Sequence, residues 1–144
     1  MKRLLIVSVL LAVSLTLFAA GGQETESPGV TDDTIRIGYT MPMSGPLGYI
    51  GGQTARTVEA IFDKYNQDGG IYGRQLELIT YDSGLDAGQA LANYRKLIQE
   101  DEVFAVLFGF GSFIPPAYSL FEEEGVPWLF PMAPPYDVMF PPRQ

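Results

Sequence analysis

Ser112 is the side chain best placed for chemistry, because it ends a glycine-containing turn at residues 109–112. An apolar run precedes this turn, and a segment with helical character follows it. A hydroxyl and the free amides at the start of a helix would together hold a carboxylate, since the helix dipole is positive there. A serine in this position more often only caps its own helix, and both interpretations stay open.

A second candidate is the loop that contains Ser44-Gly45-Pro46 and Tyr49. It follows the first predicted strand, and its glycines would let a ligand approach the backbone closely. An ordinary strand-to-helix loop explains the same residues equally well.

Asp82 and Asp86 could form a pair of carboxylates for acid–base chemistry. Neither a third acid nor a cation stands near them in the sequence. We therefore interpret Asp86 as the N-cap of a helix and Asp82 as a turn residue.

Other catalytic groups are scarce. The chain contains no cysteine and no histidine, which removes disulfides, thiolate nucleophiles, Cys/His zinc sites and the commonest acid–base residue. The Gly-x-Gly at 109–111 lacks the third glycine of a dinucleotide site, and the chain has neither a Walker A nor a Gly-x-Ser-x-Gly sequence. We expect no cofactor, no metal and no enzyme, with a carboxylate-dependent enzyme on a flavodoxin-like layer as the alternative.

The net charge is −8, from 9 basic and 17 acidic residues. An acidic chain repels phosphate backbones, so neither DNA nor any other nucleic acid is an expected partner. With 144 residues, 47% of them hydrophobic, the chain suits one domain with a packed core.

The elements that must position these residues alternate along the chain. Patterns of β-forming and apolar residues predict strands at 34–39, 75–81, 103–108 and 128–130. Helical spacing predicts one helix at 53–67, a second that begins at 86, and a short third that follows the turn at 109–112 and ends at about 124. Residues 41–52 are predicted to be a loop. One helix per crossover predicts an α/β fold, a three-layer doubly wound and mostly parallel sheet with 103–108 near its middle. In such sheets ligands bind outside the carboxyl ends of the strands.

The N-terminus has the three parts of a secretory signal: basic Lys2 and Arg3, an apolar run, and small residues at 19–22. We expect residues 1–21 to be a signal peptide, 22–33 a flexible leader, and the protein to be periplasmic or extracellular. Glycine stands where a bacterial lipoprotein would carry its lipidated cysteine, so no lipid anchor is expected.

From Ile35 to about Asp137 the chain resembles the type I periplasmic binding proteins that serve branched-chain amino acid ABC transporters. The resemblance rests on these segments: Ile37-Gly38, Ser44-Gly45-Pro46, residues 68–78 (DGGIYGRQLEL), Tyr81-Asp82 with Asp86, and residues 123–127 (EEGVP).

The resemblance implies a two-lobed, hinged protein that captures a small amino-acid-like solute and delivers it to the membrane subunits of an ABC transporter. The family grips the amino acid after the third and fourth strands. Here the first place falls on Gly111 and Ser112 beside Phe110, and the second on Met132, Ala133 and Pro134. A threonine usually stands at the position of Pro134. Because proline has neither hydroxyl nor N–H, the ligand could equally be an amide or a related carboxylate.

The family's members are more than twice as long as this chain. The resemblance therefore implies that residues 34–144 form part of the N-terminal lobe, with one wall of a binding cleft. A truncated fragment that binds nothing is the other outcome that the length allows.

Overall fold

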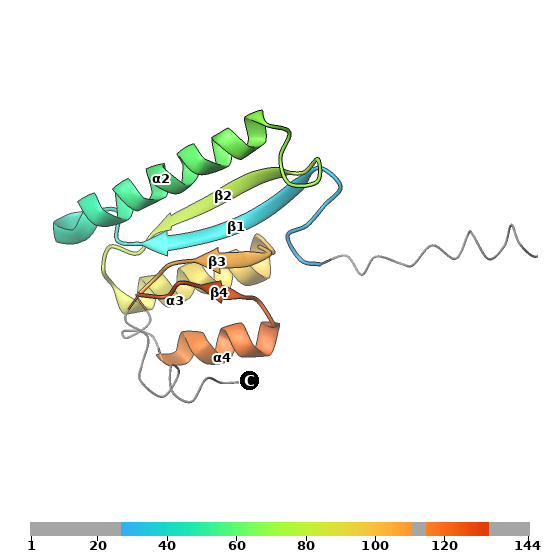
Figure 1. Cartoon of the computed structure of the whole chain (residues 1–144). Helices are drawn as coiled ribbons and strands as arrows, with labels where there is room; N and C mark the ends of the chain where they lie inside the picture. The colour runs from blue at the N-terminus through green and yellow to red at the C-terminus, as the bar shows by residue number, and fades with distance from the viewer. Residues whose placement is uncertain (1–26, 111–114, 133–144) are drawn as a thin grey trace, which may run out of the picture.

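The computed structural model describes residues 27–110 and 115–132 (Figure 1). In chain order the elements are β1 (Thr34–Met41), η1 (Gly45–Leu47), α2 (Gly48–Gln67), β2 (Gln75–Asp82), α3 (Ala87–Arg95), η2 (Lys96–Glu100), β3 (Ala105–Leu107), α4 (Pro115–Glu124) and β4 (Trp128–Leu129).

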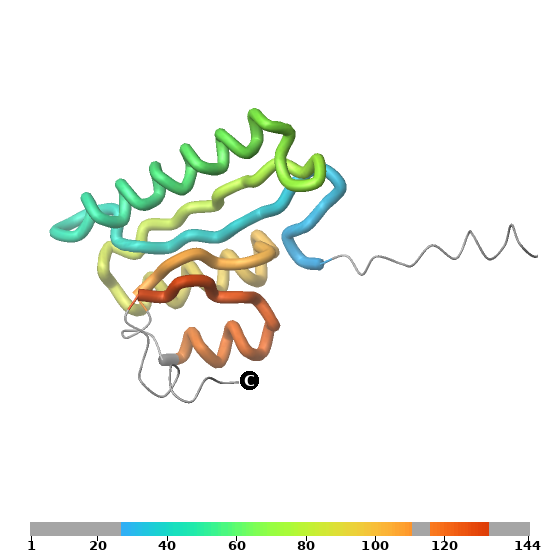
Figure 2. The backbone as a smooth tube through the Cα atoms, viewed as in Figure 1, coloured from blue at the N-terminus to red at the C-terminus, as the bar shows by residue number. Residues whose placement is uncertain are grey.

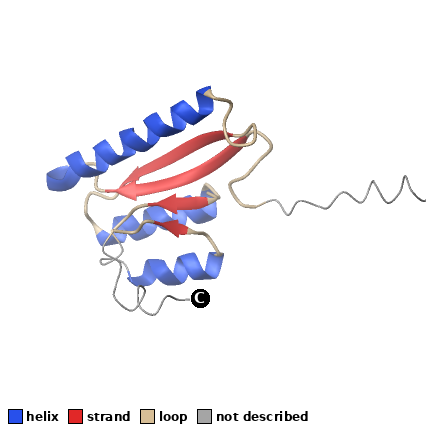
Figure 3. Ribbon diagram, viewed as in Figure 1, coloured by secondary structure: helices blue, strands red, loops and turns tan. Residues whose placement is uncertain are grey.

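The four strands form one parallel sheet in the order β2-β1-β3-β4, which confirms the predicted fold class. Ile37 of β1 lies between Leu78 of β2 and Ala105 of β3, so β3 is an inner strand, as predicted. Figure 3 shows α2 on one face of the sheet and α3 and α4 on the other. Since all strands run the same way, their carboxyl ends meet at one edge, called here the carboxyl edge.

Each face of the sheet has its own apolar core. On the α2 side, Tyr39 and Met41 of β1 pack with Ala55 of the helix. On the other side the core joins α3, η2, β3 and α4, through these buried residues: Ala90, Tyr94, Leu97, Ile98, Val103, Val106, Ala117, Phe121 and Val126. The alternation of side chains along β1 and β3 thus fills both layers, as a sheet covered on two faces requires.

Helix α2 begins at Gly48, so the prediction of loop for 48–52 was wrong. Glycine is a poor helix former, which hides the start of this helix in the sequence. Gly51 is required by packing rather than by a loop, because a Cβ there would lie 1.9 Å from the carbonyl oxygen of Pro42. Its own carbonyl accepts a 2.7 Å hydrogen bond from the buried hydroxyl of Tyr39.

Strands β3 and β4 are shorter than predicted. Strand β3 begins at Ala105 rather than at residue 103, and both strands end one residue early because Phe108 (φ 61°) and Phe130 (φ 55°) leave the extended conformation. Phe108 stays bonded across the sheet: its N–H donates to Leu129 O at 2.8 Å, and its carbonyl accepts from the indole N–H of Trp128. The backbone tube in Figure 2 shows the two segments running side by side.

Residues 27–33 pack against the sheet. The carbonyl of Gly29 accepts from Arg36 N at 2.7 Å, and the carbonyl of Thr31 accepts from Arg74 Nε at 2.7 Å. A Cβ on Gly29 would lie 2.1 Å from the nitrogen of Phe104, so this glycine permits the close approach. Among the described residues, no helix combines the length and apolar character that a membrane crossing needs.

Candidate functional site at the carboxyl edge

Four described segments make up the carboxyl edge: residues 42–47 after β1, 83–86 after β2, 108–110 after β3 and 130–132 after β4. All four β-arrows in Figure 1 point toward this edge. None of the four segments contains a lysine or an arginine, and their charge comes from Asp86 with Asp82 at the end of β2. The edge therefore offers hydroxyls, backbone groups and apolar side chains.

Asp82 ties the end of β2 to the loop after β1. Its Oδ1 accepts hydrogen bonds from Met43 N at 2.7 Å and Gly84 N at 2.8 Å. The hydrogen bond from the Ser44 hydroxyl, together with these backbone amides, lowers the pKa of the Asp82 carboxyl below its ordinary value. Asp82 is thus ionised at neutral pH. It is the last residue of β2 rather than the turn residue predicted from the sequence, and its side chain holds both the turn that follows and the neighbouring loop.

Asp86 is the N-cap of α3, as predicted. It has an extended backbone, and its Oδ1 accepts from Gln89 N at 2.7 Å. Each of the two carboxylates is therefore engaged with backbone amides of its own surroundings, and the arrangement does not resemble an acid–base pair that shares a proton.

Asn93 is a buried polar residue that lies beneath the carboxyl edge. The side chain is buried, and its Nδ2 donates to Thr40 Oγ1 at 3.0 Å and to Asp82 O at 3.1 Å. Its Oδ1 accepts from Gln89 Nε2 at 2.8 Å. Helix α3 is thereby fixed to the ends of β1 and β2. Our sequence analysis missed Asn93, although a polar residue beside the apolar stripe of a helix was a visible signal.

A small hollow of about 20 Å³ opens between the end of β1 and the start of α3. Its lining combines the hydroxyl residues Thr40, Ser83 and Tyr94 with apolar Leu85 and Phe110. This volume accommodates about one water molecule. It is therefore a feature of the site's wall rather than a complete ligand cavity.

Two buried tyrosines support the edge. Burial raises the pKa of Tyr39 to about 12, and burial together with the nearby Tyr118 raises the pKa of Tyr94 as well. Both hydroxyls therefore stay protonated at neutral pH. The Tyr39 hydroxyl donates to Gly51 O, whereas the buried Tyr94 hydroxyl has no hydrogen-bond partner among the described residues. The Tyr94 hydroxyl lies against Gly109, where a Cβ would come within 2.0 Å of it. Gly109 has φ 105°, so this residue meets both a conformational and a steric demand for glycine.

The structure brings together two of the places predicted to hold the ligand. Phe110, after β3, forms a parallel bridge with Met132, after β4, and Met132 N donates to Gly109 O at 2.7 Å. Phe110 is half-buried and Met132 is 40% exposed. The other four predicted contact residues, Gly111, Ser112, Ala133 and Pro134, lie outside the described residues.

The two predicted contacts near the first helix are also at this edge. Ser44 is exposed and precedes η1, and its hydroxyl is turned to Asp82. Tyr49 is in the first turn of α2 and 75% exposed, with its hydroxyl accepting from Gln53 Nε2 at 3.3 Å. Both side chains are therefore accessible to a solute from solvent.

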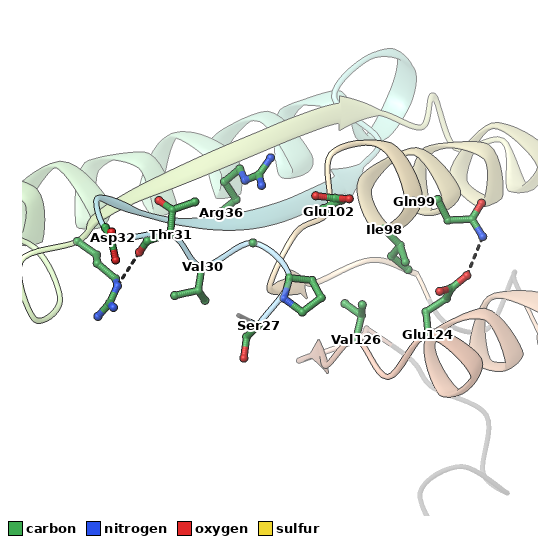
Figure 4. A pocket seen from close by; sticks show the side chains of 13 residues that line it. Ser27, Val30, Thr31, Asp32, Arg36, Ile98, Gln99, Glu102, Glu124 and Val126 are labelled. Atoms are coloured by element: carbon green, nitrogen blue, oxygen red, sulfur yellow. Dashed lines mark hydrogen bonds between the residues drawn. The ribbon is translucent and has the colours of Figure 1, made fainter. Parts of the chain in front are cut away.

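A much larger hollow, about 1040 Å³, lies at the opposite edge of the sheet (Figure 4). Arg36, Arg74 and Glu102 line it, together with residues 27–32 and the C-terminal ends of η2 and α4. Figure 4 shows the hydrogen bond between Gln99 and Glu124 in one part of its wall. In another part, Arg74 Nε donates to Thr31 O. It is a wide groove at the amino ends of the strands, whereas ligands of such sheets bind outside the carboxyl ends.

The donor groups do not suit a metal. The described residues contain no group of three or more carboxylate, thiol or imidazole side chains that could hold an ion. What the carboxyl edge can do is donate hydrogen bonds to a small molecule and cover its apolar part.

The sequence profile of the periplasmic binding protein family matches residues 34–141, and the chain belongs to this family. A similar protein is the leucine-, isoleucine-, valine-, threonine- and alanine-binding protein of Pseudomonas aeruginosa, which is 33% identical over 101 residues. That match covers 70% of this chain and 27% of the Pseudomonas protein.

Two solved structures of binding proteins are similar over most of the chain. The fatty acid ABC transporter substrate-binding protein of Thermomonospora curvata matches with a TM-score of 0.69 and 26% identity, over 76% of this chain and 28% of that one. The branched-chain amino acid transporter substrate-binding protein of Streptococcus pneumoniae, solved with isoleucine, matches with a TM-score of 0.60 and 28% identity, over 67% and 28%. The chain thus spans little more than a quarter of the length of these relatives.

Proposed function

We propose that this chain is part of the extracytoplasmic substrate-binding component of an ABC importer, and that it captures a small amino-acid-like solute. The solute is a branched-chain amino acid, an amide or a related carboxylate. The observation that carries the proposal is the pairing of Phe110 with Met132, which brings the loops after β3 and β4 together at the carboxyl edge. The names of the relatives support the solute class, since they are binding proteins for amino acids or fatty acids.

The same site supports the proposal of binding without catalysis. Both carboxylates of the edge accept hydrogen bonds from backbone amides, and the chain has no histidine or cysteine to share a proton or attack a substrate. The solute is therefore held and released unchanged, and its delivery requires the membrane subunits of a transporter.

Residues 34–144 act in this proposal as part of the N-terminal lobe, one wall of a cleft. Pockets for small molecules bury most of the ligand surface, whereas a single wall leaves much of it in water. Hydrogen bonds of this kind contribute about 0.5–1.5 kcal/mol each. Two or three of them barely offset the roughly 4 kcal/mol or more that association costs. We therefore expect dissociation constants of about 1 mM or weaker for this chain alone.

The test is to titrate amino acids, their amides and short carboxylates into the 15N-labelled protein and to monitor its amide signals by NMR. We expect amide shifts to change at Ser44, Phe110 and Met132, while Tyr72, before β2 at the opposite edge, stays unchanged. Shifts confined to Arg36, Arg74 and Glu102 would place the site in the large hollow and contradict the proposal. Conversion of any added solute would favour an enzyme instead, and micromolar binding by the monomer would refute the idea of a single wall.

Export is the second part of the proposal. The basic, apolar and small-residue order of residues 1–22 supports cleavage near Ala19–Gly22. Mass spectrometry of the protein recovered from the periplasm or medium checks this. A mature chain that still begins at Met1 would contradict it.

A further inference from the structure

Bulky apolar residues at the ends of three strands have a backbone conformation that such residues rarely adopt. Leu85 after β2 has φ 65°, Phe108 after β3 has φ 61°, and Phe130 after β4 has φ 55°. Positive φ in a bulky residue is costly, and such conformations cluster at functional sites. Glycine would relieve each of these positions, yet all three carry large side chains at the carboxyl edge.

The same region exposes apolar surface to water. Leu85 is 44% exposed, Met132 40% and Phe130 74%. These residues are neighbours along the ends of β2, β3 and β4. The rings of Phe108 and Phe130 are 6.4 Å apart, the backbones of Phe110 and Met132 are bridged two residues further on, and Leu85 shares the small hollow with Phe110. We call Leu85, Phe110, Phe130 and Met132 the apolar rim.

The charged residues of the carboxyl edge indicate which kind of molecule would cover the apolar rim. The four described segments of the edge contain no lysine or arginine, and Asp82 and Asp86 are both nearby. A solute with additional negative charge would meet no lysine or arginine in these four described segments and would face two carboxylates. An uncharged apolar group fits the rim, and an aromatic ring fits it best, because Phe130 presents an exposed ring beside the ring of Phe108 in a tilted pair.

We propose that the apolar rim binds the side chain of the captured solute, and that Phe130 makes the rim prefer an aromatic side chain over a small aliphatic one. The proposal rests on the proposed function, which supplies the solute. An aromatic contact of this kind changes affinity about fivefold.

The test compares L-phenylalanine with L-valine in NMR titrations of the protein. We expect L-phenylalanine to bind about fivefold more tightly, and Phe130→Ala to reduce this ratio to about one while changing the affinity for L-valine less than about twofold. Phe130→Gly suits the observed positive φ and should give the same loss of preference, so it serves where the alanine variant folds poorly. Tyr72→Ala removes a side chain that is 96% exposed at the opposite edge, and the ratio should not change.

The outcomes separate this proposal from the one on which it rests. Equal binding of L-valine and L-phenylalanine by the unsubstituted protein would overturn the aromatic preference and leave solute capture standing. The preference would also be overturned if both Phe130 variants kept the fivefold ratio, or if they altered only self-association in sedimentation experiments. No binding of any solute would overturn the proposed function, and this proposal with it.

Discussion

Replacing Gly51 by alanine tests whether the start of α2 is held against the strand end that carries the candidate site. Alanine is the better helix former by about 1 kcal/mol, so helix propensity alone predicts stabilisation. The added Cβ, however, would lie 1.9 Å from the carbonyl oxygen of Pro42 and 2.7 Å from its carbonyl carbon. Because these are backbone atoms, the clash requires the helix to shift.

The shift has a cost that the structure allows us to bracket. Overpacking of this kind costs about 1–3 kcal/mol. Moving Gly51 also weakens the hydrogen bond from the buried Tyr39 hydroxyl, and an unpaired buried group costs about 1–3 kcal/mol. After subtracting the gain in helix propensity, we expect Gly51→Ala to lower the free energy of unfolding by about 3 kcal/mol.

Gly52→Ala is the matched control. Its nearest contact would be the tip of the Arg56 side chain at 3.8 Å, an ordinary separation, so it should raise the free energy of unfolding by about 0.5–1 kcal/mol. Urea unfolding followed by circular dichroism measures both variants. Stabilisation of the protein by Gly51→Ala would refute the close approach of α2 to Pro42.

Three further predictions concern the polar groups of the carboxyl edge. Asp82→Asn should destabilise the protein at pH 7 by about 1 kcal/mol at most, since the carboxylate is exposed. Because the folded-state pKa of Asp82 lies below its ordinary value of 3.8, the stabilising effect of the carboxylate is lost as pH falls through that lower pKa, so the two proteins should unfold at more similar urea concentrations at pH 2.5 than at pH 7. Asn93→Ala should lower the free energy of unfolding by about 2–4 kcal/mol, since it leaves buried partners unpaired, and an unchanged urea midpoint would contradict the hydrogen bonds assigned to it. Gly109→Ala should strongly lower the free energy of unfolding, because residue 109 has positive φ and the added Cβ would clash with the Tyr94 hydroxyl. In a double-mutant cycle, Tyr94→Phe should recover part of that loss. A coupling energy of zero would disprove the contact.

Local patterns were sufficient to predict the order of the elements. Residues 75–81 and 128–130 are rich in β-formers, Asp86 is a good N-cap, and both features depend on neighbours within a few residues along the chain. The parallel arrangement also followed, since strands separated by single helices return in the same direction. The apolar run at 103–108 correctly indicated an inner strand, because both of its faces had to be covered.

Long-range contacts decided the rest. The three glycines of residues 48–52 indicate a loop when only neighbours are considered, and the helix there depends on how closely its backbone approaches Pro42, a contact that no local pattern records. Strands β3 and β4 end early because Phe108 and Phe130 adopt positive φ, which bulky residues do only where surrounding contacts hold them.

Some features of the candidate site were also predictable from local sequence, and others depend on long-range contacts. The carboxyl edge on which the site is proposed could be predicted, because a parallel sheet collects its strand ends at one edge whatever the side chains are. The bonds of Asp82 to Met43, 39 residues away, and of Asn93 to Thr40, 53 residues away, could not. Secondary structure is set by interactions over a few residues, whereas a binding surface is made by segments that only the folded chain brings within hydrogen-bonding distance.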